Sequence, residues 1–84
     1  MVMETTVAKK RVLFRDKGYF LTYRLITHAP NRHQIEILCK CNRETEREKA
    51  FFLGTKHQAY KIVKLFAEES VFPIALKETL ENYL

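Results

Sequence analysis

The spacing of hydrophobic residues changes once along the chain, near Gly54. Before this glycine, apolar side chains recur at every second position, which is the period of a half-buried β-strand. After it they recur every three or four positions, which is the period of an amphipathic helix. The pattern predicts one α+β domain over residues 1–84, with a sheet at about 6–53 and helices at about 56–69 and 74–83.

Two strands are predicted at 19–25 and 33–41, joined by turn residues at 28–32. Because a slip of one residue would turn a strand over, the apolar face determines how they pair. Pairing Thr27 with His33 places Arg24 opposite Glu36, a favourable cross-strand pair. It also gathers the apolar residues of both strands on one face: Leu21, Tyr23, Leu25, Ile35, Ile37 and Cys39.

Two further strands complete the predicted sheet. A turn at 16–18 lets a strand from about Thr6 to Phe14 pair back with the first hairpin, with Val12 and Phe14 facing inward. A short strand is expected at 49–53. Together they form an antiparallel meander of three or four strands with one face covered.

The covering elements are two C-terminal helices packed on one face of the sheet. Thr55 and Gln58 have the spacing of a capping box, which starts the first helix. Pro73 ends any continuation and favours the first turn of a second helix. The residues expected in the core are Leu21, Tyr23, Ile35, Ile37, Ile62, Val63, Phe66, Leu76 and Leu80.

The end of the chain carries a family resemblance. Val71-Phe72-Pro73, followed by the tail from Leu76 to Leu84, resembles a short domain family of unknown function from anaerobic Gram-positive bacteria. Members of that family end in a helix, a Val-x-Pro break and a leucine-rich acidic tail; here the tail acid falls on Glu81 and the next position is Asn82. The resemblance extends from about residue 19 onward. It implies the fold and a bacterial or phage-borne origin, and it implies no activity.

Charge is unevenly distributed along the chain. The net charge is +5, and residues 1–49 hold eleven basic and six acidic side chains, whereas residues 50–84 hold four of each. This asymmetry favours an acidic or polyanionic partner, although a charge of this size also keeps many small proteins soluble. No stretch approaches the roughly 18 apolar residues of a membrane span, and no signal-peptide core is visible. A cytoplasmic protein without a membrane partner is expected.

The cysteines and histidines give little sign of chemistry. Cys39 and Cys41 are too far apart on a strand for a relaxed disulfide, and reduced, buried thiols are expected. With His33 they could supply three zinc ligands, but the Cys-x2-Cys spacing of zinc sites is missing. The histidines, expected at the surface, have no nucleophile and base spacing, and no glycine-rich phosphate loop exists. No enzyme activity, metal or small-molecule cofactor is therefore predicted.

The sheet face opposite the helices is the candidate binding surface. Its predicted binding residues are Lys9, Arg11, Phe20, Arg24, Leu38 and Lys40, accompanied by the apolar residues Leu13 and Ile26. Basic groups beside an exposed aromatic ring suit single-stranded nucleic acid. Apolar residues on an outer face also mark protein interfaces, including homodimers.

These features predict a small, non-enzymatic binding or regulatory protein that acts through its basic, partly apolar sheet face. The favoured partner is another protein or a second copy of the chain. The alternative is a sequence-tolerant protein that binds single-stranded nucleic acid. A phage-type inhibitor of a host enzyme is a third possibility, which the residues do not separate from the first.

Overall fold

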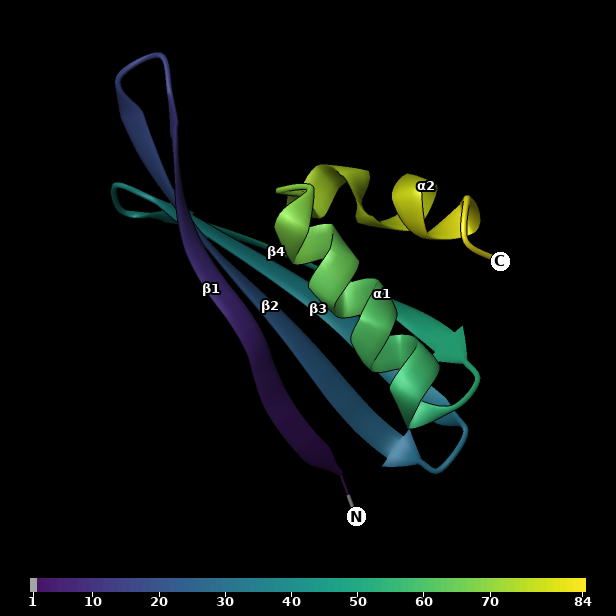
Figure 1. Ribbon diagram of the computed structural model, residues 1–84. Helices are drawn as coiled ribbons and strands as arrows, with labels where there is room; N and C mark the ends of the chain where they lie inside the picture. The colour runs from purple at the N-terminus through teal and green to yellow at the C-terminus, as the bar shows by residue number, and fades with distance from the viewer. Residues whose placement is uncertain (1) are drawn as a thin grey trace.

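The computed structural model describes residues 2–84. Four strands, β1 (Met3–Phe14), β2 (Lys17–Ala29), β3 (Arg32–Cys41) and β4 (Glu44–Leu53), form one antiparallel sheet in the order β1-β2-β3-β4. They are followed by α1 (Lys56–Glu68), a 3-10 turn η1 (Pro73–Ala75) and α2 (Leu76–Glu81) (Figure 1). The predicted α+β architecture, an antiparallel meander followed by two C-terminal helices, is confirmed.

The register of the central hairpin is the one that the apolar pattern predicts. Thr27 pairs with His33, and Arg24 pairs with Glu36. In the same register, Tyr23 faces Ile37 on the side of the sheet toward the helices. We call this side the inner face and the opposite side the outer face.

The β1–β2 hairpin turns at a different place from the one predicted. The turn residues are Arg15 and Asp16, both with positive φ (51° and 64°), and not residues 16–18. Gly18 lies inside β2, opposite Leu13, where the Arg11 side chain crosses it. A Cβ atom on Gly18 would lie 3.2 Å from Nε of Arg11, so this glycine provides space for a side chain and does not form the turn.

Both edge strands of the sheet, β1 and β4, are longer than predicted. β1 begins at Met3 and contains a bulge at Val7, because the register shifts between Thr6 and Ala8. β4 begins at Glu44 and pairs with β3 along its whole length. The first half of β4 consists almost entirely of charged residues, so no apolar period marks it as a strand. It is a strand because it pairs with β3.

The ends of α1 are fixed by local hydrogen bonds. The capping box is confirmed: the Gln58 amide donates to Oγ1 of Thr55 at 3.1 Å, and the Thr55 amide donates to Oε1 of Gln58 at 2.9 Å. At the other end Ser70 adopts positive φ (56°), and the Val71 amide donates to the Phe66 carbonyl, as in a Schellman motif. Nζ of Lys10 on β1 also donates to the Ala67 carbonyl at 2.9 Å, where a cation favours the helix dipole.

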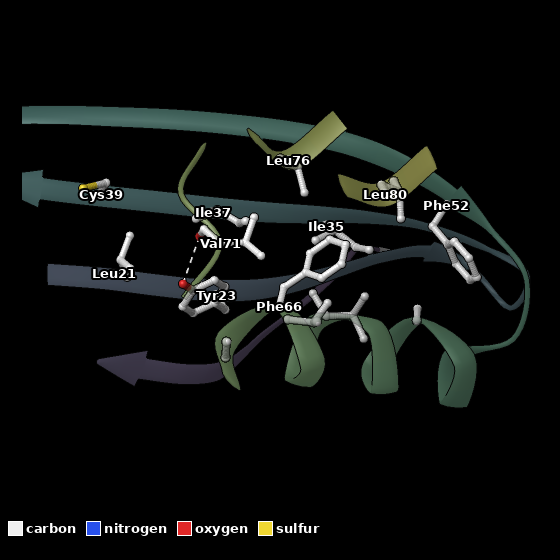
Figure 2. Close-up of a cluster of buried hydrophobic side chains, with 14 residues drawn as sticks. Leu21, Tyr23, Ile35, Ile37, Cys39, Phe52, Phe66, Val71, Leu76 and Leu80 are labelled. Atoms are coloured by element: carbon white, nitrogen blue, oxygen red, sulfur yellow. Dashed lines mark hydrogen bonds between the residues drawn. The ribbon is translucent and has the colours of Figure 1, made fainter. Parts of the chain in front are cut away.

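The core lies between the inner face and the two helices (Figure 2). Eight of the nine predicted core residues are buried; Ile62 is half-buried and packs against the cluster. The Tyr23 hydroxyl donates to the Val71 carbonyl at 2.9 Å, which ties β2 to the segment between the helices. Val12 packs against the core, but Phe14 is 57% exposed because the tip of the β1–β2 hairpin projects beyond the helices (Figure 1).

Candidate functional site

The outer face carries the whole net charge of the protein. Side chains alternate along each strand, and the register assigns to this face seven basic residues and two acidic residues. They are Lys9, Arg11, Arg24, Arg32, Lys40, Arg47 and Lys49, with Glu4 and Glu36. The excess of seven over two is five, which equals the chain's net charge of +5; the other eight basic residues are matched by eight acidic ones.

An ionic ladder crosses the centre of the outer face. Nη2 of Arg24 lies 2.6 Å from Oε2 of Glu4, and Nη1 of the same guanidinium lies 3.1 Å from Oε1 of Glu36. The other Glu36 oxygen lies 3.5 Å from Nε of Arg47 and 3.6 Å from Nζ of Lys49. These residues come from all four strands, and Glu36 is only 1% exposed. Arg24, a predicted binding residue, therefore contributes to holding the sheet together and is only partly free for a ligand.

Four of the predicted binding residues lie at the end of the outer face where the β1–β2 and β3–β4 turns are found. Phe20 on β2 pairs with Arg11 on β1 and with Lys40 on β3, so the three form one row across the sheet. The Arg11 guanidinium lies 5.7 Å from the centroid of the Phe20 ring, and the ring is 56% exposed. Lys9 lies beside this row, two residues before Arg11 on β1.

Two shallow recesses meet at the Phe20 ring. One, of about 540 Å³, is lined by Arg11, Phe20 and Lys40 with Gly18 and Asn42. The other, of about 420 Å³, lies toward Lys9 and Thr22 and is also lined by Arg11 and Phe20. Within residues 2–84, none of Lys9, Arg11 and Lys40 forms an ion pair with a carboxylate. A planar or anionic group can therefore approach the ring with unpaired cations on either side.

The opposite end of the outer face holds a second aromatic cluster that the sequence analysis missed. Phe51 on β4 pairs with Gln34 and is 52% exposed. The Arg32 guanidinium lies 4.9 Å from its ring centroid, and the His28 ring lies 5.9 Å away. The signal was the alternation in the predicted strand at 49–53: if Phe52 faces inward, its neighbour Phe51 must face outward.

The apolar residues predicted on this face have different environments. Leu38 is half-buried and Ile26 is almost completely buried, so neither forms an open apolar patch. Ile26 lies between Glu4 and Gln34 in the register, whose long side chains flank it. Leu13, near the hairpin tip, is exposed.

Both thiols and the His33 imidazole lie on the inner face, but they do not meet. Cys39 is buried and Cys41 is half-buried, and neither forms a disulfide. Burial raises the pKa of the Cys39 thiol, and the neighbouring Glu46 adds to this effect, which keeps the thiol protonated. Within residues 2–84, no group of three or more His, Cys, Asp and Glu side chains could hold a metal ion.

His33 is buried, which corrects the expectation of a surface histidine. Its Nδ1 lies 3.1 Å from Oγ1 of Thr27, and its Nε2 lies 3.1 Å from the Gly54 carbonyl. The ring therefore joins the β2–β3 hairpin to the connection that leads into α1. It lies six residues from Cys39 on β3, about 20 Å along an extended strand, so the two cannot share a ligand.

A groove of about 600 Å³ lies on the inner face at the hairpin tips. Its lining mixes cations, carboxylates, thiols and aromatic rings, contributed by Lys17, Tyr19, Cys39, Cys41, Asn42, Arg43, Glu44, Glu46 and Phe72. Glu46 stands opposite Cys39 and Glu44 opposite Cys41. No charge of one sign dominates the groove, in contrast to the outer face.

Comparison with protein-family models, with curated proteins and with solved structures found no match to this chain. Within the described part of the chain, neither α-helix has the length and apolar character needed to cross a membrane.

Proposed function

We propose that this chain is a small, non-enzymatic binding protein that acts through its outer face on an anionic macromolecule. The observation that supports this most directly is the location of the entire net charge on one face of the sheet. A face with an excess of five positive charges attracts polyanions and accelerates their association. The helix side, in which opposite charges balance, lacks this attraction.

Two classes of partner fit such a face. A protein partner, the class favoured by the sequence, would present an acidic surface and would also cover the exposed Leu13 and Leu53 at the margins of the face. A nucleic acid would use the exposed rings of Phe20 and Phe51. A cytoplasmic location suits both partners and suits two free thiols.

Self-association through the outer face is the weakest of the sequence-based alternatives. Two copies stacked on this face would bring two surfaces with the same positive excess together, and like charges across an interface oppose binding. A second copy is therefore not the partner that we propose.

A pair of triple variants with identical net charge tests the proposal. One replaces Lys9, Arg11 and Lys40 with glutamine on the outer face; the control replaces the exposed Lys56, Lys61 and Lys64 of α1. We expect the first variant to weaken binding to polyglutamate and to an oligonucleotide at low salt, and the control to retain binding. The dependence of the logarithm of affinity on the logarithm of salt should become shallower only in the first variant.

Equal losses in the two variants would show that binding follows net charge alone and not the outer face. Loss only in the α1 variant would move the site to the helix. Absence of binding to either polyanion at low salt would refute the proposed function.

A further inference from the structure

We infer that the anionic partner is a single-stranded nucleic acid, held along the outer face between the rings of Phe20 and Phe51. This inference rests on the proposed function and names the ligand of the same surface. It depends on two observations beyond the charge: a second exposed ring on the same face, and a run of partly free cations between the two rings.

Each ring combines an open face with a nearby cation. Phe20 and Phe51 are both more than half exposed, and a guanidinium lies within 6 Å of each ring centroid, from Arg11 and from Arg32 respectively. Unpaired bases stack on such rings, and neighbouring arginines add cation-π and phosphate contacts. Exposed aromatic rings on a four-stranded sheet are one way in which proteins bind single-stranded RNA.

The cations between the rings retain exposed charge despite the ionic ladder. Arg47 and Lys49 share the second oxygen of Glu36 at 3.5 and 3.6 Å, while their side chains are 56% and 43% exposed. One carboxylate cannot neutralise both of them together with Arg24. Phosphates passing over the centre of the sheet therefore meet a positive surface.

The spacing of the two rings fits a short single strand. The β3 partners of Phe20 and Phe51 are Lys40 and Gln34, six residues apart. Six residues correspond to about 20 Å along the strand, and two strand spacings add about 10 Å across it. The diagonal of these two lengths is about 22 Å, which at about 3.4 Å per stacked nucleotide is roughly six to seven steps, so a strand of roughly seven or eight nucleotides joins the rings.

The rings distinguish this ligand from the other polyanions. In a duplex the base faces are already stacked and cannot reach a protein ring. The carboxylates of an acidic protein need cations but gain little from the face of a phenylalanine, whose quadrupole is negative there. A single-stranded nucleic acid offers unpaired bases to the rings and phosphates to the cations, so it uses both.

Binding measurements with four probes of similar length test this inference. The probes are an oligothymidylate of about twelve nucleotides, an abasic sugar-phosphate chain with equal phosphates, a duplex and polyglutamate. The variants are Phe20→Ala and Phe51→Ala, with Tyr60→Ala on α1 as the matched control because its ring is also exposed. Fluorescence anisotropy at fixed salt gives each affinity, and circular dichroism verifies that each variant is folded.

We expect the oligothymidylate to bind more tightly than the abasic chain. Each phenylalanine substitution should weaken oligothymidylate binding about 5- to 150-fold and leave abasic binding unchanged. Phe20→Trp should retain the affinity that Phe20→Ala loses, because tryptophan preserves a stacking face. Tyr60→Ala should change neither.

Three results would overturn the inference while the proposed function stands. They are equal affinity for the oligothymidylate and the abasic chain, tighter binding of the duplex, and polyglutamate binding that is tightest and loses affinity in the phenylalanine variants. The last result would identify an acidic protein as the partner. Failure of all four probes at low salt would refute the proposed function as well.

Discussion

At the centre of the sheet, the two faces reach the same degree of burial by opposite means. Ile37 and Glu36 are neighbours on β3; the first is 0% exposed on the inner face and the second is 1% exposed on the outer face. Helices cover Ile37, so apolar area is removed from water there. Glu36 is covered by long cationic side chains from neighbouring strands, so its burial depends on charge pairing.

This difference separates stability from binding. The inner face has few exposed groups near its centre, and most of its residues serve the core. The outer face has a buried ionic centre and exposed, partly unpaired ends, where cations lie beside the rings. We therefore expect substitutions at the inner face to change the free energy of unfolding, and substitutions at the ends of the outer face to change binding.

The largest predicted effect is that of Phe66→Ala in the core. Phe66 is fully buried against the inner face, and its truncation should lower the free energy of unfolding by about 3–5 kcal/mol. Ile37→Ala should act in the same direction, by about 2–5 kcal/mol. Chemical denaturation gives both values.

Phe20→Ala is the matched control, since it removes the same ring from the outer face. Its effect on the free energy of unfolding should stay within about 0.5 kcal/mol. Similar denaturation midpoints for Phe66→Ala and Phe20→Ala would contradict the prediction that the inner face stabilises the fold and the ends of the outer face do not.

Breaking the ionic ladder should have the next largest effect. Glu36→Gln removes the buried charge that holds Arg24, Arg47 and Lys49, and we expect a loss of about 2–3 kcal/mol. Glu48→Gln is the control: Glu48 pairs with Lys77 at 3.6 Å, and both side chains are substantially exposed.

An exposed pair of this kind contributes about 0–1 kcal/mol, so Glu48→Gln should be nearly neutral. High salt should reduce the difference in free energy of unfolding between the two variants only slightly, because Glu36 is shielded from solvent. A Glu36→Gln protein as stable as the parent would show that the ionic ladder does not contribute to stability.

The sequence predicted the inner face better than the outer one, for a physical reason. Core positions follow from a hydrophobic period and one register, and the pairing of Thr27 with His33 was sufficient to align both central strands. The capping box of α1 was also readable, because its two partners lie three residues apart. Such signals are local or repeat regularly.

What the sequence missed depends on contacts without a period. The bulge at Val7 changes which residues of β1 face outward, and it lets Glu4 join the same face as Lys9 and Arg11. Gly18 indicated a turn but provides space for the Arg11 side chain. The outward position of Phe51 follows from the register between β3 and β4, which the apolar pattern alone does not give.

A third prediction concerns the hydrogen bond of Tyr23, which lies under the helices. Tyr23→Phe removes the donor to the buried Val71 carbonyl and should lower the free energy of unfolding by about 1–2 kcal/mol at neutral pH. Burial raises the pKa of Tyr23 above its usual value near 10, and the adjacent Cys39 adds to the shift. The folded protein therefore holds this proton at a pH where the unfolded chain releases it.

The sign of the pH dependence follows from this difference in bound protons. The unfolded state binds fewer protons above pH 10, so stability contributed by Tyr23 is present below that pH and falls as the pH rises further. Tyr23→Phe should flatten this alkaline decline, whereas Tyr60→Phe on the exposed side of α1 should not. An unchanged slope in Tyr23→Phe would assign the decline to other groups, Cys39 among them.

The smallest effect is expected from the thiols, which mark where the helices stop covering the inner face. Cys39 is buried and Cys41 half-buried, and both face the side of the sheet away from the proposed ligand. Replacing both with valine keeps an apolar side chain of similar size at each position, so the free energy of unfolding should change by less than about 1.5 kcal/mol. Oligonucleotide binding should not change, because no thiol lies on the outer face. Stoichiometric zinc in the purified protein, with unfolding on addition of a chelator, would contradict this prediction, since it would make the thiols metal ligands instead of packing groups.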